Sequence, residues 1–339
     1  MTDNDTSGRL EEALERLHAS GPERDGWLTN HAPMVVESLA AHGQAGAVHR
    51  WVDLYTDKLE DFPDRVAPVT DDNWREALGD PRRIADWTDH YSRALAEQPW
   101  RTVLATWWPR LLPGLYGGAT HTVIRVGHAV RALEADENAP RVTELAHALG
   151  YWAARHQPVT GVAALPGAPT ALTSLDAVPA IEPGHMGFRD RLAAVHRLPT
   201  WAGDVTDPDT ARARLTELVR AATHRYATHG HGEPTMLVHA ATAPNAVLRT
   251  LDALPRDQWA PSLHAAWNAS AAVTAMYGPE EAVAYAPPAR LTPEEVLERA
   301  LAHGDEHVIK LTDTALDFGD DLALAAALRS VEMSVPLAG

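Results

Sequence analysis

The sequence contains no cysteine, which excludes disulfide bonds, thiolate metal sites and a cysteine nucleophile. It also has no apolar run that approaches the ~20 residues needed to cross a bilayer, so we expect no association with membranes. The first residues, MTDNDTSGRLEE, are polar and lack the apolar core of a secretory signal. These absences predict a cytoplasmic protein.

Positive charge is scarce as well. The chain has 29 Lys and Arg against 46 Asp and Glu, a net charge of −17, and no basic cluster that would attract phosphates. We therefore expect no nucleic-acid partner. The sequence has no P-loop, no GxGxxG motif after a strand and no GxSxG elbow. It therefore gives no support for the familiar kinds of nucleotide-dependent chemistry.

What the chain has instead is helical periodicity. Leu10, Leu14 and Leu17 form an apolar stripe with the spacing of a helix, and similar stripes recur along the sequence. Strand signals are few, and the flanks of the turn dipeptide Asp25-Gly26 are not strand-like. The sequence predicts an all-α protein, with helices near residues 34–43, 87–96, 100–112, 120–134, 142–154, 211–228, 234–252, 261–276, 293–303, 306–316 and 322–333.

The segment 157–210 is the least regular, because closely spaced proline and glycine residues interrupt helices there. It could be a linker between domains or an ordered excursion that covers a pocket. We favour one globular domain over 1–339 with a lid at 157–210, since histidines of interest lie on both sides of this segment. The sequence does not indicate an oligomeric state.

The protein is rich in histidine, with 18 residues, and in tryptophan, with 11 against only 3 phenylalanines. His307 and Lys310 are three positions apart, so they share a face of the predicted helix 306–316. A buried lysine can become a neutral amine and take up carbon dioxide, and the resulting carboxylated lysine is an anionic metal ligand. The alternative is a solvated Lys310 paired with Asp313 or Asp317.

Other histidines could join such a site. His121 and His128 lie about 20° apart around one predicted helix, and Arg125 is near the same stripe. His31 directly precedes a helix, and His239 follows an apolar run. Each could equally be a core histidine that is satisfied by a backbone carbonyl. His264 could contact a metal ligand without binding the metal itself. Most of the other histidines, including His147 and His156, are interpreted as solvated.

The motifs NHAPM, GGATHTVIRVGHAVRAL, VHAATAPNA and DEHVIKLTD occur in this order. Together they resemble the questin oxidase-like family over about residues 26–317. Members of that family oxidise and open quinone-type rings. They have been described as NADPH-dependent Baeyer–Villiger oxidases, and some are similar to non-haem iron dioxygenases with four histidines and a carboxylated lysine.

The resemblance implies an oxygenase of secondary metabolism that acts on a small aromatic polyketide such as an anthraquinone. It implies a metal, Fe(II) or zinc instead, with dioxygen as co-substrate. The metal would be held by five ligands: His31, His121, His239, His307 and carboxylated Lys310. His264 could replace His239, and Arg125 and His128 are candidate catalytic residues. NADPH has no recognisable fingerprint here. The alternatives are a zinc-dependent hydrolase or lyase and a non-catalytic helical protein that binds an aromatic ligand.

Overall fold

The computed structural model describes residues 4–182, 187–287 and 290–337, and helices dominate these residues. The all-α prediction is confirmed, because the strands in these described ranges are limited to two very short pairs. The chain divides into two compact units. The first contains the chain through Pro158 together with Asp252–Pro255, and the second contains Val159–Leu251 and the chain from Arg256 onward. The single domain with a lid stays a prediction.

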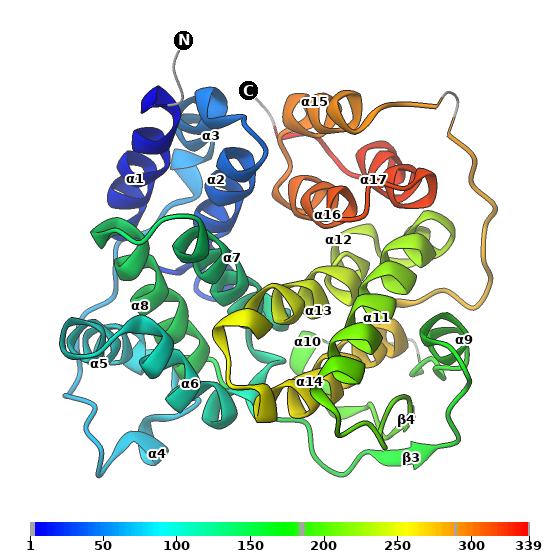
Figure 1. Ribbon diagram of the computed structural model, residues 1–339, viewed down its shortest axis with the longest axis horizontal. Helices are drawn as coiled ribbons and strands as arrows, with labels where there is room; N and C mark the ends of the chain where they lie inside the picture. Colours follow the sequence, from blue (N-terminus) through cyan, green and yellow to red (C-terminus); the bar gives the residue numbers. More distant parts are fainter. Residues whose placement is uncertain (1–3, 183–186, 288–289, 338–339) are drawn as a thin grey trace. The chain divides into compact units, whose positions relative to one another are not determined.

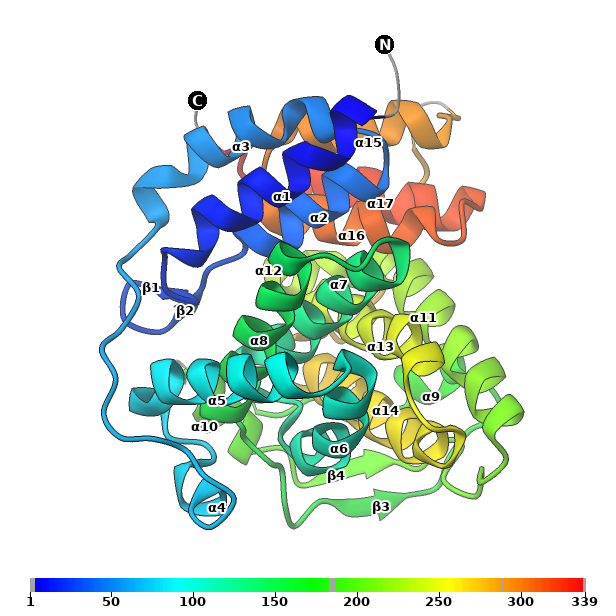
Figure 2. The ribbon, with the colours of Figure 1, turned by 60° about the vertical axis from the view of Figure 1, so that its left-hand side comes forward.

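In the first unit, α1 and α2 pack side by side with α3, and α2 also packs on α7, while α5 lies against α8 (Figure 2). The elements of this unit are α1 (Asn4–His18), β1 (Glu23–Arg24), β2 (Leu28–Thr29), α2 (Ala32–Ala41), α3 (Val48–Tyr55), α4 (Trp74–Ala77), α5 (Ile84–Glu97), α6 (Trp100–Leu111), α7 (His121–Ala135) and α8 (Ala139–Ala154).

In the second unit, the long helix α11 packs on α13, α14 and α17, and α16 packs on α13, α15 and α17 (Figure 1). The elements of this unit are β3 (Ala163–Leu165), α9 (Ala171–Asp176), α10 (Phe188–Ala193), β4 (Arg197–Pro199), α11 (Pro208–His229), α12 (Pro234–Leu237), α13 (His239–Thr250), α14 (Trp259–Tyr277), α15 (Pro293–His303), α16 (Glu306–Leu316) and α17 (Asp321–Met333).

Three local predictions need correction. The flanks of Asp25-Gly26 are strands after all: β1 and β2 pair antiparallel around this turn, in which both residues have positive φ. The predicted helix 234–252 is two helices that meet at Val238. The segment 157–210 is not wholly irregular, because it holds a parallel β3–β4 pair and two short helices; its residues 183–186 lie outside the described residues.

The interior of each unit is apolar, and most tryptophans contribute to it. Trp87, Trp108 and Trp152 are among the largest fully buried side chains. Among the described helices, none combines the length and the apolar character that a bilayer span requires. The cytoplasmic location stays a prediction.

Candidate functional site

His121 follows a strained turn in the first unit. Gly118, Ala119 and Thr120 have φ values of 54°, 55° and 71°, and α7 begins at His121 directly after them. Left-handed backbone costs an alanine or threonine about 1–2 kcal/mol per residue, and such strain persists where the surroundings hold it in place. Glycine is required at position 118 for a second reason, since a Cβ there would meet the Tyr151 hydroxyl at 2.6 Å.

The consequence of this turn is a fixed orientation of the His121 ring. Its Nδ1–H donates to the carbonyl oxygen of Gly118 at 2.6 Å. The proton is thereby assigned to Nδ1, and Nε2 carries a lone pair. A backbone carbonyl behind a histidine ring is the usual arrangement for a metal ligand, because it fixes both the tautomer and the direction of the free nitrogen.

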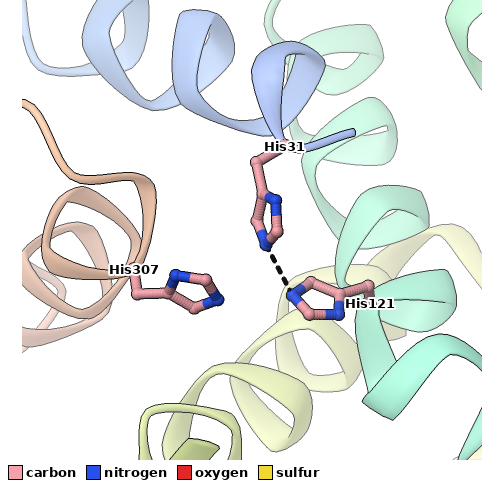
Figure 3. A group of neighbouring side chains, drawn as sticks. All are labelled: His31, His121 and His307. Atoms are coloured by element: carbon pink, nitrogen blue, oxygen red, sulfur yellow. Dashed lines mark hydrogen bonds between the residues drawn. The ribbon is translucent and has the colours of Figure 1, made fainter. Parts of the chain in front are cut away.

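His31 lies at the start of α2 and faces His121. The Asn30 side chain accepts from the backbone N–H of Ala32 at 3.0 Å and donates to Gly21, and the backbone N–H of His31 donates to the Tyr55 hydroxyl. These contacts fix the chain at His31. Its Nε2 lies 2.7 Å from Nε2 of His121, with the two rings nearly perpendicular (Figure 3). The first unit therefore brings two predicted ligands together.

His128 lies two turns further along α7 and has a different environment. Its Nδ1 contacts the Glu37 carboxylate at 2.6 Å, and Arg131 donates to the same carboxylate. Burial alone would raise the pKa of Glu37, but Arg131 and His128 outweigh it and lower the pKa to about 2. This ion-paired cluster ties α2 to α7, the two helices that position His31 and His121.

Arg125 is also held in a buried ion pair. Its guanidinium donates to both oxygens of Glu144 at 2.6 and 2.9 Å, and His18 contacts the same carboxylate at 3.1 Å. Burial would raise the pKa of Glu144, but Arg125 and the contact with His18 hold it well below its usual range. The catalytic roles of Arg125 and His128 stay predictions; the contacts described here are those of structural ion pairs.

In the second unit, His239 begins α13 and is fully buried. Its Nδ1–H donates to the Met236 carbonyl at 3.0 Å, so its Nε2 also carries a lone pair. Burial, aided by the charge of Lys310, lowers the pKa of His239 well below its usual value and keeps the ring neutral. The ring of His307 packs edge-on against it, with centroids 5.5 Å apart.

Lys310, one turn after His307 on α16, is only 1% exposed. Its Nζ has no hydrogen-bond partner among the described residues. The two carboxylates that could have paired with it, Asp313 and Asp317, bind Arg249 instead. The solvated interpretation of Lys310 is therefore wrong. Burial lowers the pKa of Lys310 to about 7, although Glu306 and Asp305 oppose that shift.

Two carboxylates that the sequence did not single out lie beside His307. Asp305 caps α16 by accepting from the backbone N–H groups of His307 and Val308, and Glu306 is buried. Ligand atoms of Asp305, Glu306 and His307 all lie within 4.8 Å of one another. Burial and the neighbouring Glu306 raise the pKa of Asp305. The only sequence signal was their position immediately before the HxxK pair.

His264, the possible substitute for His239, is half-buried on α14. Its Nε2 lies 3.0 Å from the carbonyl oxygen of Ala202, to which it donates. The Nε2 atom of His264 is therefore a donor to a backbone carbonyl, whereas in His239 it is Nδ1 that donates. The structure thus places His239, His307 and Lys310 together in the second unit.

The sequence model of the questin oxidase-like family matches residues 28–314, which include His31, His121, His239, His307 and Lys310. Comparison with curated proteins gives no match.

Proposed function

Because this chain belongs to the questin oxidase-like family, we propose that it is an iron-dependent oxygenase that acts on an aromatic polyketide such as an anthraquinone. The family's name describes an oxidase; the iron, the dioxygen and the substrate are parts of the proposal. The proposed ligands are the two histidines of the first unit and three residues of the second: His31, His121, His239, His307 and carboxylated Lys310.

The observation that carries the proposal is the tautomer of two rings. His121 and His239 each donate Nδ1–H to a backbone carbonyl, so both present Nε2 as a lone pair. The Nε2 atoms of His31 and His121 lie 2.7 Å apart, so the two rings could hold one metal ion between them.

Lys310 fits the fifth position. Its amine lacks a hydrogen-bond partner among the described residues, and burial favours the neutral form. A neutral amine can form an N–C bond to carbon dioxide and release one proton, and the product is a carbamate whose single negative charge is shared by two oxygens. Such an oxygen donor offsets part of a 2+ charge that four neutral imidazoles leave uncompensated.

Fe(II) in this donor set would supply the binding and one-electron reduction of dioxygen. The residues of the chain hold the ligands in place: the carbonyls of Gly118 and Met236 orient two rings, and Asp305 caps the helix that carries His307. A reaction that inserts both oxygen atoms of dioxygen into the ring-opened product balances without a reductant. The proposal therefore does not require NADPH.

The test is anaerobic reconstitution of the full chain with Fe(II), followed by measurement of oxygen uptake with hydroxyanthraquinones. We expect one iron per chain and substrate-dependent oxygen uptake, both lost in His307→Ala. His231→Ala, which changes an exposed histidine, is the matched control and should retain both. Full activity of His307→Ala would refute the proposal, as would stoichiometric zinc with turnover that needs no oxygen.

Carboxylation of Lys310 is tested separately. Protein loaded in ¹³C-bicarbonate should show one carbamate carbon signal that Lys310→Met lacks. If the protein binds iron and is active but shows no such signal, Lys310 is not carboxylated. The four histidines would then remain the proposed ligands.

A further inference from the structure

The first unit contains a cavity that the proposed metal chemistry does not use. It has a volume of about 320 Å³ and opens between α1, α5, α8 and the segment after Asp61. Its lining residues include His18, Phe62, Thr88, Asp89, Ser92 and His147. None of them is among the proposed metal ligands.

Three rings make up one wall of the cavity. The ring of His147 lies 4.7 Å from that of His18 in a tilted arrangement, and Phe62 meets His147 edge-on at 5.2 Å. Such rings offer faces and edges that favour another flat aromatic ring at similar separations. The wall therefore suits an aromatic ligand better than an aliphatic one.

His147 supplies the polar group of this wall. Contrary to the sequence interpretation, it is not solvated, since it is only 9% exposed. Its ring also lines the cavity and contacts the rings of His18 and Phe62. Burial, aided by Arg125, lowers the pKa of His147 to about 3, so the ring is neutral near pH 7 and offers one donor and one acceptor.

The charges at the opening of the cavity are largely compensated. Arg65 binds Asp89 at 2.7 Å, and Arg93 approaches the same carboxylate at 3.4 Å. Both arginines are exposed, so solvent screens their electrostatic attraction for a charged ligand. Behind His18, the Glu144 carboxylate is already neutralised. These contacts favour an uncharged ligand.

We infer that this cavity is a binding site for a small uncharged hydroxyarene, whose ring packs against His18 and Phe62 and whose hydroxyl hydrogen-bonds to His147. The volume lies at the lower end of the range for ligand pockets, about 300–1,000 Å³. One or two rings fit this size. The inference does not depend on the metal chemistry proposed above.

The probe is 2-naphthol, compared with 2-methoxynaphthalene, which has the same rings but no hydroxyl proton to donate. Binding to the full-length chain is measured by titration calorimetry, and the ring of His147 is followed through its long-range ¹H–¹⁵N signals. Ser92→Trp fills the cavity from an exposed position on α5, and Ala96→Trp, one turn further and outside the lining, is its matched control. His147→Phe keeps a ring in the wall and removes both nitrogens.

We expect 2-naphthol to shift the His147 signals and to bind more tightly than 2-methoxynaphthalene. Ser92→Trp should abolish this binding and Ala96→Trp should not. His147→Phe should weaken 2-naphthol by about two- to tenfold, the effect of one hydrogen bond, and leave 2-methoxynaphthalene nearly unchanged. Unshifted His147 signals at millimolar 2-naphthol, or equal binding to wild type and a folded Ser92→Trp, would overturn the inference.

Discussion

Nε2 of His31 lies 2.7 Å from Nε2 of His121, although the two residues are 90 positions apart in the sequence. Since Nδ1 of His121 donates to Gly118, only one proton is available between the two Nε2 atoms, and it comes from His31. A metal ion can replace that proton without moving either ring far. The pair is therefore a candidate ligand pair whose geometry is set before any metal binds.

The first prediction concerns this pair. His121→Ala should lower the affinity for Fe(II) by at least about a hundredfold, more than the ten- to hundredfold typical of residues behind a ligand. His264→Ala is the matched control, because its Nε2 already donates to Ala202, and it should bind iron normally. Equilibrium metal titration against a competing chelator measures both variants.

A different result would reassign one ligand. If His264→Ala loses iron and His239→Ala retains it, then His264 takes the position that we give to His239. Iron affinity that is the same in wild type and His121→Ala would exclude the His31–His121 pair as ligands.

The second prediction concerns the cost of burying Lys310. Its pKa falls from 10.5 to about 7 on folding. With a lowered pKa, the folded protein releases the Lys310 proton at a lower pH than the unfolded chain does. Burial of the lysine therefore carries no ionisation cost above pH 10.5. As the pH falls from 10.5 towards 7, the free energy of unfolding decreases by up to about 1.4 kcal/mol per pH unit.

Lys310→Met removes this titration and keeps an unbranched side chain of similar length. In metal-free protein without carbon dioxide, we expect the variant to be more stable than wild type at pH 7 by several kcal/mol, since about 1.4 kcal/mol accumulates for each pH unit between the two pKa values. The difference should shrink towards pH 10. Urea unfolding at several pH values measures it. A variant that is less stable than wild type at pH 7 would contradict the burial of an unpaired amine.

The third prediction concerns Arg125, for which the sequence suggested a catalytic role. In the structure Glu144 binds its guanidinium through two hydrogen bonds, and both side chains are buried. Removing one partner leaves an uncompensated charge, so Arg125→Met and Glu144→Gln should each cost about 3–5 kcal/mol of stability. The double variant should cost clearly less than the sum, because no lone charge remains.

Urea unfolding of the four proteins in this cycle gives the coupling between Arg125 and Glu144. Strictly additive losses would contradict a structural ion pair. If Arg125→Met keeps wild-type stability and loses substrate binding alone, the catalytic role holds instead.

Local sequence signals were sufficient to predict several helices accurately. The bounds of α15 and α16 match the prediction because their ends are specified by adjacent residues. Thr292 and Glu295 form a capping box at one end of α15, and Gly304 adopts the left-handed conformation at the other. The Asp25-Gly26 hairpin was missed because two-residue strands are too short to show an alternating pattern.

Burial of single polar residues could not be predicted in the same way. The spacing of His307 and Lys310 showed a shared face but not whether that face was solvated, and the carboxylates next along the helix turned out to bind Arg249. His147 is buried because His18 and Phe62, both distant in sequence, pack on it. Such contacts depend on tertiary packing, which no local pattern records.

The last prediction concerns the strained turn before α7. Ala119 has a φ of 55°, a conformation that costs alanine about 1–2 kcal/mol and glycine almost nothing. Glycine loses more backbone entropy on folding, which offsets about 0.5–1 kcal/mol of that gain. Ala119→Gly should therefore stabilise the protein slightly. Ala202→Gly, at the same φ of 55° in the second unit, is the matched control and should give a similar gain.

The two variants should differ in metal affinity. The turn aims the His121 ring through the Gly118 carbonyl, and a glycine at position 119 allows other backbone conformations in which that contact is lost. We expect Ala119→Gly to bind Fe(II) more weakly and Ala202→Gly to bind it as wild type does. Equal affinity in both variants would show that the strain at Ala119 has no part in holding His121. The two changes relieve similar backbone strain, but only Ala119 lies in the turn that precedes His121.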